Sequence, residues 1–438
     1  MLKLFNRYFY LKTETLKISI AILHFALIFY CVYSLSKKWA VNSEKLFWSA
    51  FLFRLAAGIS LGLIYTYYYT AGDTWSFFND AKFFAALARD DFFTYIKTIF
   101  DFGENQLLKG LINQDLRSIF FIKIISVFCL LSLDNYWVCA TYLSLLSFIC
   151  AWLLHRKVIS IFSDSNNASA VAFLFFPSVV FWSSGLEKES VALCGIYFLT
   201  NGFLSLTFSR NPDKLFWWLV IPVCYIVWEL KYYWAAIFFV SIFSALILQF
   251  LMSKSSIIEK YSSVAWIILF FGMGVLLSFT NFNFNLSRFP EVIISSYNDL
   301  AAISDPKNLI HYFQFDQTWT SIIINSPWAL VSGLFRPVIG EGRGLFGLLA
   351  SIENFLVLIL FIGGLLNLKN VFNSSYRIIL LTALSYCLVL CVFLALSTPN
   401  FGTLSRYRVG FYPFFVFVVV YNNPIVEWVF NKTGLNRL

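Results

Sequence analysis

The chain alternates long apolar runs with short polar connectors along almost its whole length. Eleven runs are apolar enough to be predicted as membrane helices: residues 17–35, 46–70, 136–154, 168–184, 190–208, 215–228, 233–251, 263–279, 350–368, 378–397 and 409–421. Residues 118–133 and 322–339 are also apolar, but they are short for a bilayer that needs about 20 residues per helix. They are interpreted either as spans or as helices at the membrane surface. The pattern predicts an all-α transmembrane helical bundle of about 11–13 spans, forming one integral membrane domain over residues 1–438.

Composition agrees with that pattern and excludes two classes of protein. Charged residues make up only 13% of the chain, against about 25% in soluble domains, so a soluble protein is excluded. The formal net charge of +9 comes mostly from Lys and Arg in short connectors, where basic residues set orientation and meet anionic headgroups. Membrane lipids are therefore expected partners, and nucleic acid is not. The eight Cys lie in apolar runs and are interpreted as small core residues.

The basic connectors predict which side each loop faces, because cytoplasmic loops carry the excess of Lys and Arg. Five are assigned to the cytoplasm: His155-Arg156-Lys157, Arg210 with Lys214, Lys254 with Lys260, Lys369 with Arg377, and Lys432 with Arg437. If residues 322–339 do not cross completely, residues 185–189, 280–321 and 398–408 then face outward. Arg406 and Arg408 break the rule on that side, and a phosphate ligand would explain the exception.

The side of residues 71–117 depends on whether residues 118–133 cross the membrane. If they cross, the loop is cytoplasmic, which the basic amino terminus slightly favours; if they lie flat, the loop faces outward. Aromatic residues recur in the loop at near-helical spacing between charged residues, the pattern of amphipathic helices that lie in the membrane interface. The loop is therefore predicted to form interfacial helices on whichever side it lies.

The first candidate for chemistry is AGDTWSFFNDAKFFA at residues 71–85. A carboxylate at the mouth of a membrane span is costly to place and is a functional hypothesis by default. Asp73 is therefore a candidate catalytic residue and Asp80 a candidate substrate ligand. The alternative is that Asp73 caps a helix that begins at Thr74, since Asp is a favoured N-cap residue. Both interpretations stay open.

The second candidate is FPSVVFWSSGLEKESVAL at residues 176–193, where Pro177 can bend a span before a Ser-Ser-Gly turn. Glu187 or Glu189 could hold a divalent cation or an acceptor hydroxyl, and Lys188 could meet phosphate. The alternative is a polar turn in which the Glu and Lys side chains neutralise each other.

Three arginines complete the candidate substrate-binding residues. Arg406 and Arg408 precede an apolar run, and the planar fork of arginine suits phosphate better than the point charge of lysine. The alternative is that both extend to the membrane interface beside Tyr407. Arg336 is followed by Pro337, which indicates a broken, partly inserted element next to a lipid-headgroup or substrate cavity. The alternative there is an internal ion pair with a glutamate in or near this apolar sequence, Glu341 or Glu353.

These pieces, in this order, resemble the integral-membrane glycosyltransferases of the GT-C superfamily, such as protein O-mannosyltransferases and the aminoarabinose transferase that modifies lipid A. The resemblance rests on three stretches: Gly72-Asp73 with the aromatics and Asp80-Ala81 that follow, LDNYWVCATYLSLLSFICAWLLHRKV, and LFFPSVVFWSSGLEKES. The later RYR is similar to motifs of bacterial polysaccharide-assembly proteins. The chain departs from the family in lacking two adjacent carboxylates at Asp73. The family's arrangement implies that residues 71–117 face outward.

The resemblance implies an enzyme that moves a sugar from a polyprenyl-phosphate-linked donor to a glycan, lipid or protein acceptor at the outer face of a bacterial-type inner membrane. Arg406 and Arg408, helped by Lys188, would hold the donor phosphate, and Asp73 would take the proton of the acceptor hydroxyl. Residues 280–321 would cover the site, and the metal requirement stays open. Two alternatives remain: a polysaccharide polymerase or ligase, which needs no base of this kind, and a transporter or flippase for lipid-linked glycans.

Overall fold

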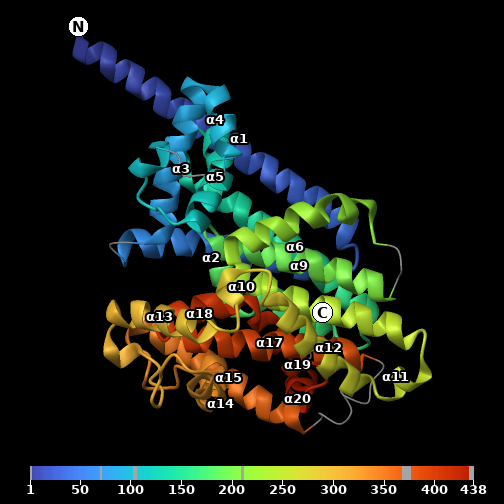
Figure 1. Ribbon diagram of the computed structural model, residues 1–438. Helices are drawn as coiled ribbons and strands as arrows, with labels where there is room; N and C mark the ends of the chain where they lie inside the picture. The colour runs from blue at the N-terminus through green and yellow to red at the C-terminus, as the bar shows by residue number, and fades with distance from the viewer. Residues whose placement is uncertain (1, 70–71, 102–105, 209–211, 367–375, 434–438) are drawn as a thin grey trace. The chain divides into compact units, whose positions relative to one another are not determined.

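The computed structural model describes residues 2–69, 72–101, 106–208, 212–366 and 376–433, and within them the chain is almost entirely helical (Figure 1). An isolated bridge between Leu309 and Asn400 is the only β-type pairing in these residues. Seven of the described helices are long and apolar enough to cross a membrane: residues 15–39 within α1 (Leu2–Trp39), α2 (Glu44–Tyr67), α6 (Tyr136–Ile161), α9 (Lys188–Phe208), α10 (Lys214–Met252), α15 (Gly344–Leu365) and α17 (Arg377–Ser397). The predicted all-α, polytopic membrane fold is confirmed.

Two compact units divide the chain that the sequence analysis treats as one membrane domain. Of the described residues, unit 1 contains those within 2–152 and 180–194, and unit 2 contains those within 153–179 and 195–433. Three basic positions used to predict orientation, Arg210, Lys369 and Arg437, lie outside the described residues.

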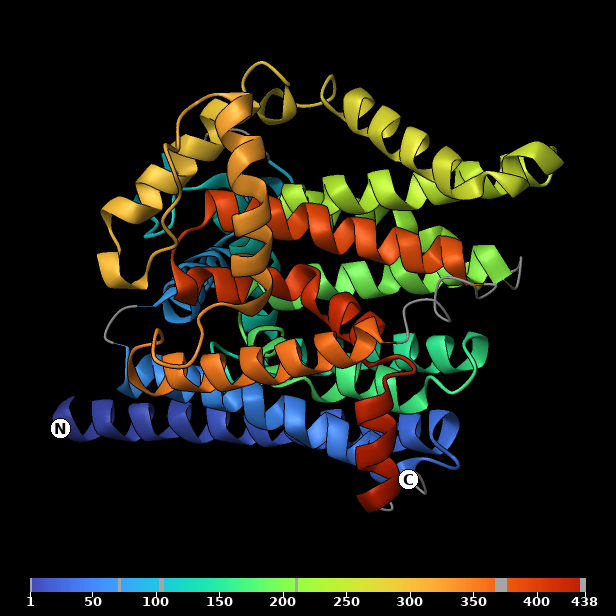
Figure 2. The same ribbon diagram turned by 90° about the horizontal axis from the view of Figure 1, so that it is seen from below.

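Unit 1 is built on α2 and the first part of α6, which pack antiparallel. The ring of Phe47, near the start of α2, lies 4.9 Å from that of Trp152 in α6. Gly62, near the end of α2, lies instead against Tyr136, the first residue of α6, where a Cβ would come within 2.7 Å of the tyrosine ring. The end of α2 and the start of α6 therefore lie at the same end of unit 1. α1 packs beside α2 (Figure 2).

The residues between α2 and α6 form α3 (Asp73–Asp90), α4 (Phe92–Ile99), the 3-10 helix η1 (Gln106–Gly110) and α5 (Leu116–Leu131). At the start of α3, the hydroxyl of Thr74 lies 2.8 Å from that of Tyr136. Near the end of α3, Arg89 binds Asp134 at 2.8 Å. These α3 positions are about 22 Å apart along the helix, yet their partners are two positions apart in the chain. α3 therefore lies across the amino end of α6, as predicted for an interfacial helix.

α5, which contains most of residues 118–133, packs against α3. The two arrangements predicted for these residues, crossing the membrane or lying flat, stay predictions.

Residues 168–184, predicted as one span, form three short pieces instead. They contain the end of α7 (Asn166–Ser169), the π-helix η2 (Ala170–Phe175) and α8 (Pro177–Trp182). Phe176 is extended, with ψ of 117°, because the ring of Pro177 excludes the α conformation from the residue before it. The apolar run is therefore helical on both sides of a break at Phe176, next to the proline that was predicted to bend it.

Helix α10 contains the two spans predicted at residues 215–228 and 233–251. Lys231 between them is non-helical, with φ of −146° and ψ of 66°. Gly202 of α9 lies against Phe216 in the first half of α10. Residues of α9 between 200 and 204 also line an apolar cavity with residues between 238 and 242 of the second half. Both halves of α10 therefore pack beside the same part of α9. The chain thus reverses direction at Lys231, and the two predicted spans are distinct helices.

In unit 2, the start of helix α14 (Trp319–Phe335) and the residues after its end lie beside the same segment of the chain. The indole of Trp319 at its start and the guanidinium of Arg343 after its end both bind residues of the 280–321 segment, at 2.9 and 3.3 Å. Near the tip of α14, Gly333 packs against Cys391, six residues before the end of α17. The residues on both sides of α14 therefore lie beside the 280–321 segment, and the interpretation that residues 322–339 do not cross the membrane completely stays a prediction.

The remaining described helices of unit 2 are short or pack along the longer ones. They are α11 (Ser256–Lys260), α12 (Ser262–Leu277), η3 (Phe282–Phe284), α13 (Phe289–Ala302), η4 (Pro306–Asn308), α18 (Phe401–Tyr407), η5 (Arg408–Gly410), α19 (Tyr412–Val420) and α20 (Pro424–Thr433). α10, α12 and α17 lie side by side (Figure 2). Residues 409–421, predicted as a span, form the end of η5 and α19, which has 9 residues and directly follows α18 and η5.

Candidate functional sites in the two units

Asp73 is the first helical residue of α3 and is exposed. The N-cap is Gly72, whose backbone lies so close to the Tyr65 ring that a Cβ would come within 1.9 Å of it. The suggestion that Asp73 caps a helix starting at Thr74 is therefore wrong by one position. Its carboxylate still benefits from the positive end of the helix dipole, but it is not the capping group.

Several predicted residues of unit 1 gather around Tyr136. The Tyr136 hydroxyl meets Thr74, the neighbour of Asp73, and the Trp75 ring stacks on the Tyr136 ring with centroids 3.9 Å apart. Tyr136 also interacts electrostatically with Glu187. Asp73 and the Glu187 turn, both predicted to share one side of the membrane, therefore lie at the same end of unit 1.

The Glu187–Glu189 turn is buried rather than exposed. Glu187 and Glu189 are both 0% exposed. The turn before them is possible because Gly185 has φ of +76° and lies against Gly58 of α2. Buried carboxylates in a membrane protein need charged or polar neighbours, and they mark this turn as more than a surface loop.

Arg54 is another buried charge of unit 1. It lies in the middle of α2, is 0% exposed, and donates to the hydroxyls of Ser147 at 2.5 Å and Ser183 at 2.8 Å. The signal in the sequence is an arginine in the centre of an otherwise apolar run. Its effect is to tie α2, α6 and the turn that leads to Glu187 together.

Lys188 is held by its neighbours in unit 1. Its ammonium donates to the Ser118 hydroxyl at 2.9 Å and lies 5.0 Å from the centre of the Phe77 ring. It also acts on Asp115, the N-cap of α5: burial opposes ionisation of that carboxyl, but the Ser118 hydrogen bonds and the Lys188 charge outweigh it and lower its pKa. Lys188 thereby joins the start of α9 to the start of α5.

Asp80 is also occupied by local contacts. Its carboxylate accepts hydrogen bonds from the backbone N–H groups of Ile112 at 3.0 Å and Asn113 at 2.9 Å, and from the Asn113 side chain at 2.8 Å. It is 4% exposed. Asp80 therefore fixes the segment before α5 against α3, and these contacts favour a structural role over substrate binding.

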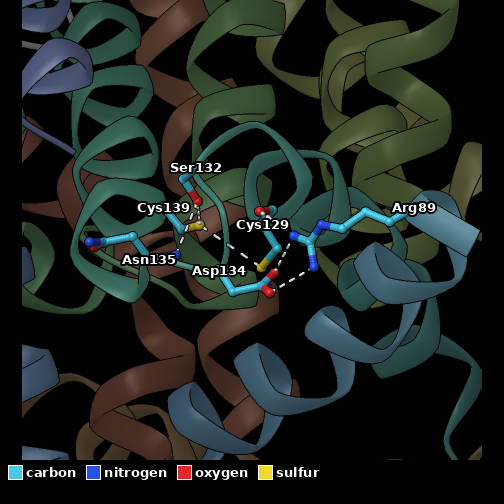
Figure 3. A network of polar contacts seen from close by, with 6 residues as sticks. All are labelled: Arg89, Cys129, Ser132, Asp134, Asn135 and Cys139. Carbon is cyan, nitrogen blue, oxygen red and sulfur yellow. Dashed lines mark hydrogen bonds and ion pairs between the residues drawn. The ribbon is translucent and has the colours of Figure 1, made fainter. Parts of the chain in front are cut away.

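A polar network fixes the far end of α3 to the turn between α5 and α6 (Figure 3). Arg89 forms a two-point pair with Asp134, with both N···O distances at 2.8 Å, and its guanidinium also donates to the Cys129 carbonyl at 3.5 Å. Such forked arginine–carboxylate pairs define orientation as well as contributing energy. Together with the Thr74–Tyr136 contact, this pair holds α3, and with it Asp73, in place.

In unit 2, Arg408 is the charged group with the strongest functional signal. It begins η5, is 1% exposed, and its guanidinium lies 4.2 Å from the centre of the Tyr412 ring. Its nearest carboxylate oxygen belongs to Glu353, 3.6 Å away. Among the described residues, none of its three guanidinium nitrogens has a hydrogen-bond partner. A buried guanidinium whose nitrogens lack hydrogen-bond partners is suited to bind an anion.

Glu353 is anchored on its other side. Its second carboxylate oxygen accepts the Ser178 N–H at 2.8 Å, and the neighbouring Asn354 donates to the Pro337 carbonyl at 3.0 Å. The carboxylate is thus fixed in position while Arg408 keeps its hydrogen-bonding capacity. Glu353 lies in an apolar run 55 positions before Arg408, so the sequence alone could not pair the two residues.

Arg406 and Arg408 have different surroundings. Positions two apart on a helix do not face each other, so the two arginines do not form one binding fork, and Arg408 is the better candidate for a phosphate. Tyr407 between them faces the ammonium of Lys231, which lies 4.0 Å from the ring centre. The break in α10 therefore supports the turn that carries both arginines.

Arg336 forms the internal pair that was the alternative to substrate binding. Its guanidinium reaches both oxygens of Glu341, with the shortest N···O distance at 2.7 Å. This pair closes the turn after α14, and it favours a structural role for Arg336.

The 280–321 segment packs on the residues that precede Arg406. The Ile310 N–H donates to the Pro399 carbonyl at 2.9 Å, and the Asn400 side chain donates to Ser304 at 3.0 Å. Two segments predicted to face the same side, 280–321 and 398–408, thus lie together in unit 2.

The described residues contain no group of three or more His, Cys, Asp or Glu side chains placed to hold a metal ion. Comparison of the chain with models of protein families, with curated proteins and with solved structures gives no match. Functional inference therefore rests on the chemistry and geometry of the chain's own residues.

Proposed function

We propose that the protein is an integral-membrane glycosyltransferase that moves a sugar from a polyprenyl-phosphate-linked donor to a hydroxyl acceptor. The buried, under-bonded guanidinium of Arg408 is the observation that carries this proposal. A phosphate is the leaving group in such a transfer, and a cation prearranged in a site of low dielectric stabilises the charge that develops on it. The donor's apolar chain would place that phosphate at membrane depth.

Asp73 is proposed as the general base. Its carboxylate is exposed on the first turn of a helix that is fixed at both ends, so it is reachable and its position is defined. It would accept the proton of the acceptor hydroxyl as the oxygen attacks the anomeric carbon, with inversion at that carbon. The buried Glu187 and Glu189 are proposed to shape the same end of unit 1, with Lys188 joining α9 to α5 there.

The setting proposed for this reaction is a bacterial-type inner membrane, with Asp73 and the Glu187 turn facing outward and a cell-surface glycan, lipid or protein as acceptor. The absence of paired repeats in the sequence favours transfer over transport. A polymerase or ligase would also use the phosphate-binding arginine, but it would not need Asp73 as a base.

The experiment that tests the proposal compares Asp73→Asn with Asp90→Asn, at the opposite, exposed end of the same helix. Membranes that contain each variant are given radiolabelled polyprenyl-phosphate sugars, and transfer of label to acceptor is measured. Asp73→Asn is expected to lower the rate by about 10²- to 10⁴-fold, the contribution of a general base, while Asp90→Asn keeps it.

Three results would separate the alternatives. Transfer that persists in Asp73→Asn but not after Arg408 is replaced would indicate a polymerase or ligase. Movement of the labelled lipid across the membrane with no new glycosidic bond would indicate a flippase. Equal activity in all variants would refute the assignment of these residues.

A further inference from the structure

Two cysteines of unit 1 point toward each other beneath the turn that joins α5 and α6 (Figure 3). The Sγ atoms of Cys129, in the last turns of α5, and Cys139, in the first turns of α6, are 3.9 Å apart, and both side chains are 0% exposed. The Ser132 hydroxyl lies 3.3 Å from the Cys139 sulfur. The glycosyltransferase proposal uses neither thiol.

The backbone around this pair is tightly fixed. The Asp134 N–H donates to the Cys129 carbonyl at 2.9 Å, and Leu133 and Asp134 both have positive φ, at 51° and 61°. Asn135 caps α6 by accepting the Trp137 N–H at 3.0 Å. The turn therefore holds the two cysteine-bearing helices in one register, and side-chain rotation with a small approach of the two helices would bring the sulfurs together.

The surface above the pair is accessible, although the sulfurs are not. The side chains of Arg89 and Asp134, which cover the turn, are 34% and 26% exposed. An oxidant can therefore reach the surface of this turn.

We propose that Cys129 and Cys139 form a disulfide when this turn is exposed to an oxidising environment, linking α5 to α6 under the helix that carries Asp73. The oxidant is a disulfide. One cysteine thiolate attacks it to form a mixed disulfide and releases one thiolate; the second cysteine thiolate then displaces the other. Two electrons pass to the oxidant, whose two thiolate products take up the two protons, and the Cys129–Cys139 bond is formed.

The bond is expected to stabilise unit 1 because it restricts the unfolded chain and fixes the turn that Arg89 holds. Its formation in cells rests on the outward orientation included in the proposed function, since outward-facing segments meet oxidising conditions. The ability of the pair to bond does not depend on that orientation.

The test uses the full-length protein from membranes, alkylated directly in denaturant or after reduction, with peptides that contain both cysteines analysed by mass spectrometry. Cys139→Ala should leave Cys129 open to alkylation without reduction. Cys150→Ala/Cys194→Ala, which removes a second pair of neighbouring thiols within the helices, should leave the Cys129–Cys139 bond intact. Reduction should lower the midpoint temperature of thermal unfolding of the wild-type protein. It should leave the midpoint of Cys139→Ala unchanged.

A bonded pair in protein taken directly from cells supports both the inference and the outward orientation. A pair that is reduced in cells but bonds when folded or refolding protein meets oxidised glutathione supports the inference and contradicts the orientation. Free thiols at both positions after refolding in oxidised glutathione overturn the inference, whatever the activity of the enzyme.

Discussion

At the scale of single residues, the charges buried in each unit are the features that most need explanation. Arg408 and Glu353 are 3.6 Å apart inside unit 2, close enough to attract each other but too far for a strong hydrogen bond. A buried pair of this kind is weak evidence for stability, because desolvation offsets much of the attraction. A binding role for Arg408 explains why the charge is kept.

This role predicts different outcomes for single and double substitutions. Arg408→Met should destabilise unit 2 by about 3–5 kcal/mol, because it leaves the Glu353 carboxylate buried without its partner. Arg408→Met combined with Glu353→Leu should recover most of the stability, measured by thermal unfolding in detergent, because apolar side chains replace a buried pair at little cost. Sugar transfer should remain absent in the double variant.

The matched control is Arg336→Met combined with Glu341→Leu, which removes the pair after α14. This variant should keep transfer if it folds. Transfer at wild-type rate in the Arg408→Met/Glu353→Leu protein would show that Arg408 is structural only.

At the scale of helices, the hydrophobic pattern predicted most spans, and it failed where short-range chemistry interrupts an apolar run. The two halves of α10 were predicted as separate spans, at residues 215–228 and 233–251. Pro177 was predicted to bend its span, but because helices tolerate proline with a simple bend, the full break at Phe176 did not follow from the sequence. Residues 409–421 are largely buried in unit 2, and hydropathy does not distinguish a helix buried in protein from one that contacts lipid.

The sequence predicted which residues belong to the candidate sites better than it predicted the contacts that these residues make. Asp73, Glu187, Lys188 and Arg408 could be selected because charges near or within apolar runs are rare. The groups that contact Asp80 and Arg408 could not be predicted, because they come from distant positions in the chain or from backbone groups. The one-residue error at the cap of α3 arose because Gly72 also fits an N-cap, as glycine is tolerated there.

Helix α5 gives a test of local stability with a defined dependence on pH. Asp115 accepts the Ser118 N–H at 3.0 Å, and the folded state lowers its pKa. Its stabilising effect is therefore full above the ordinary carboxyl pKa of about 3.9 and is lost as pH falls through the lower folded value. Amide exchange in the first turn of α5 should accelerate below that pH in the wild type.

Asp115→Asn should remove this pH dependence and keep much of the cap, because the Asn side chain also accepts the Ser118 N–H. Asp115→Ala should loosen the turn at all pH values, by about 1 kcal/mol. Exchange that responds to pH equally in wild type and Asp115→Asn would show that Asp115 is not the titrating group.

At the scale of the whole molecule, the account depends on the side of the membrane that the Asp73 end of unit 1 faces. The structure brings Asp73, Tyr136 and the Glu187 turn to one end of that unit, so these residues face the same side together. A donor phosphate, an acceptor hydroxyl and an oxidised Cys129–Cys139 pair are all expected outside the cytoplasm. One orientation therefore links the proposed reaction to the proposed disulfide.

The most direct measurement of that claim labels single cysteines with a membrane-impermeant maleimide, in protein whose eight native cysteines are replaced. Asn79→Cys reports on α3, where the residue is exposed, and Ser160→Cys reports on the far end of α6, about 36 Å from Tyr136 along the helix. The account predicts that Asn79→Cys is labelled in intact cells and Ser160→Cys only after the membrane is opened. The reverse pattern would place Asp73 in the cytoplasm and contradict the proposed outward-facing transfer.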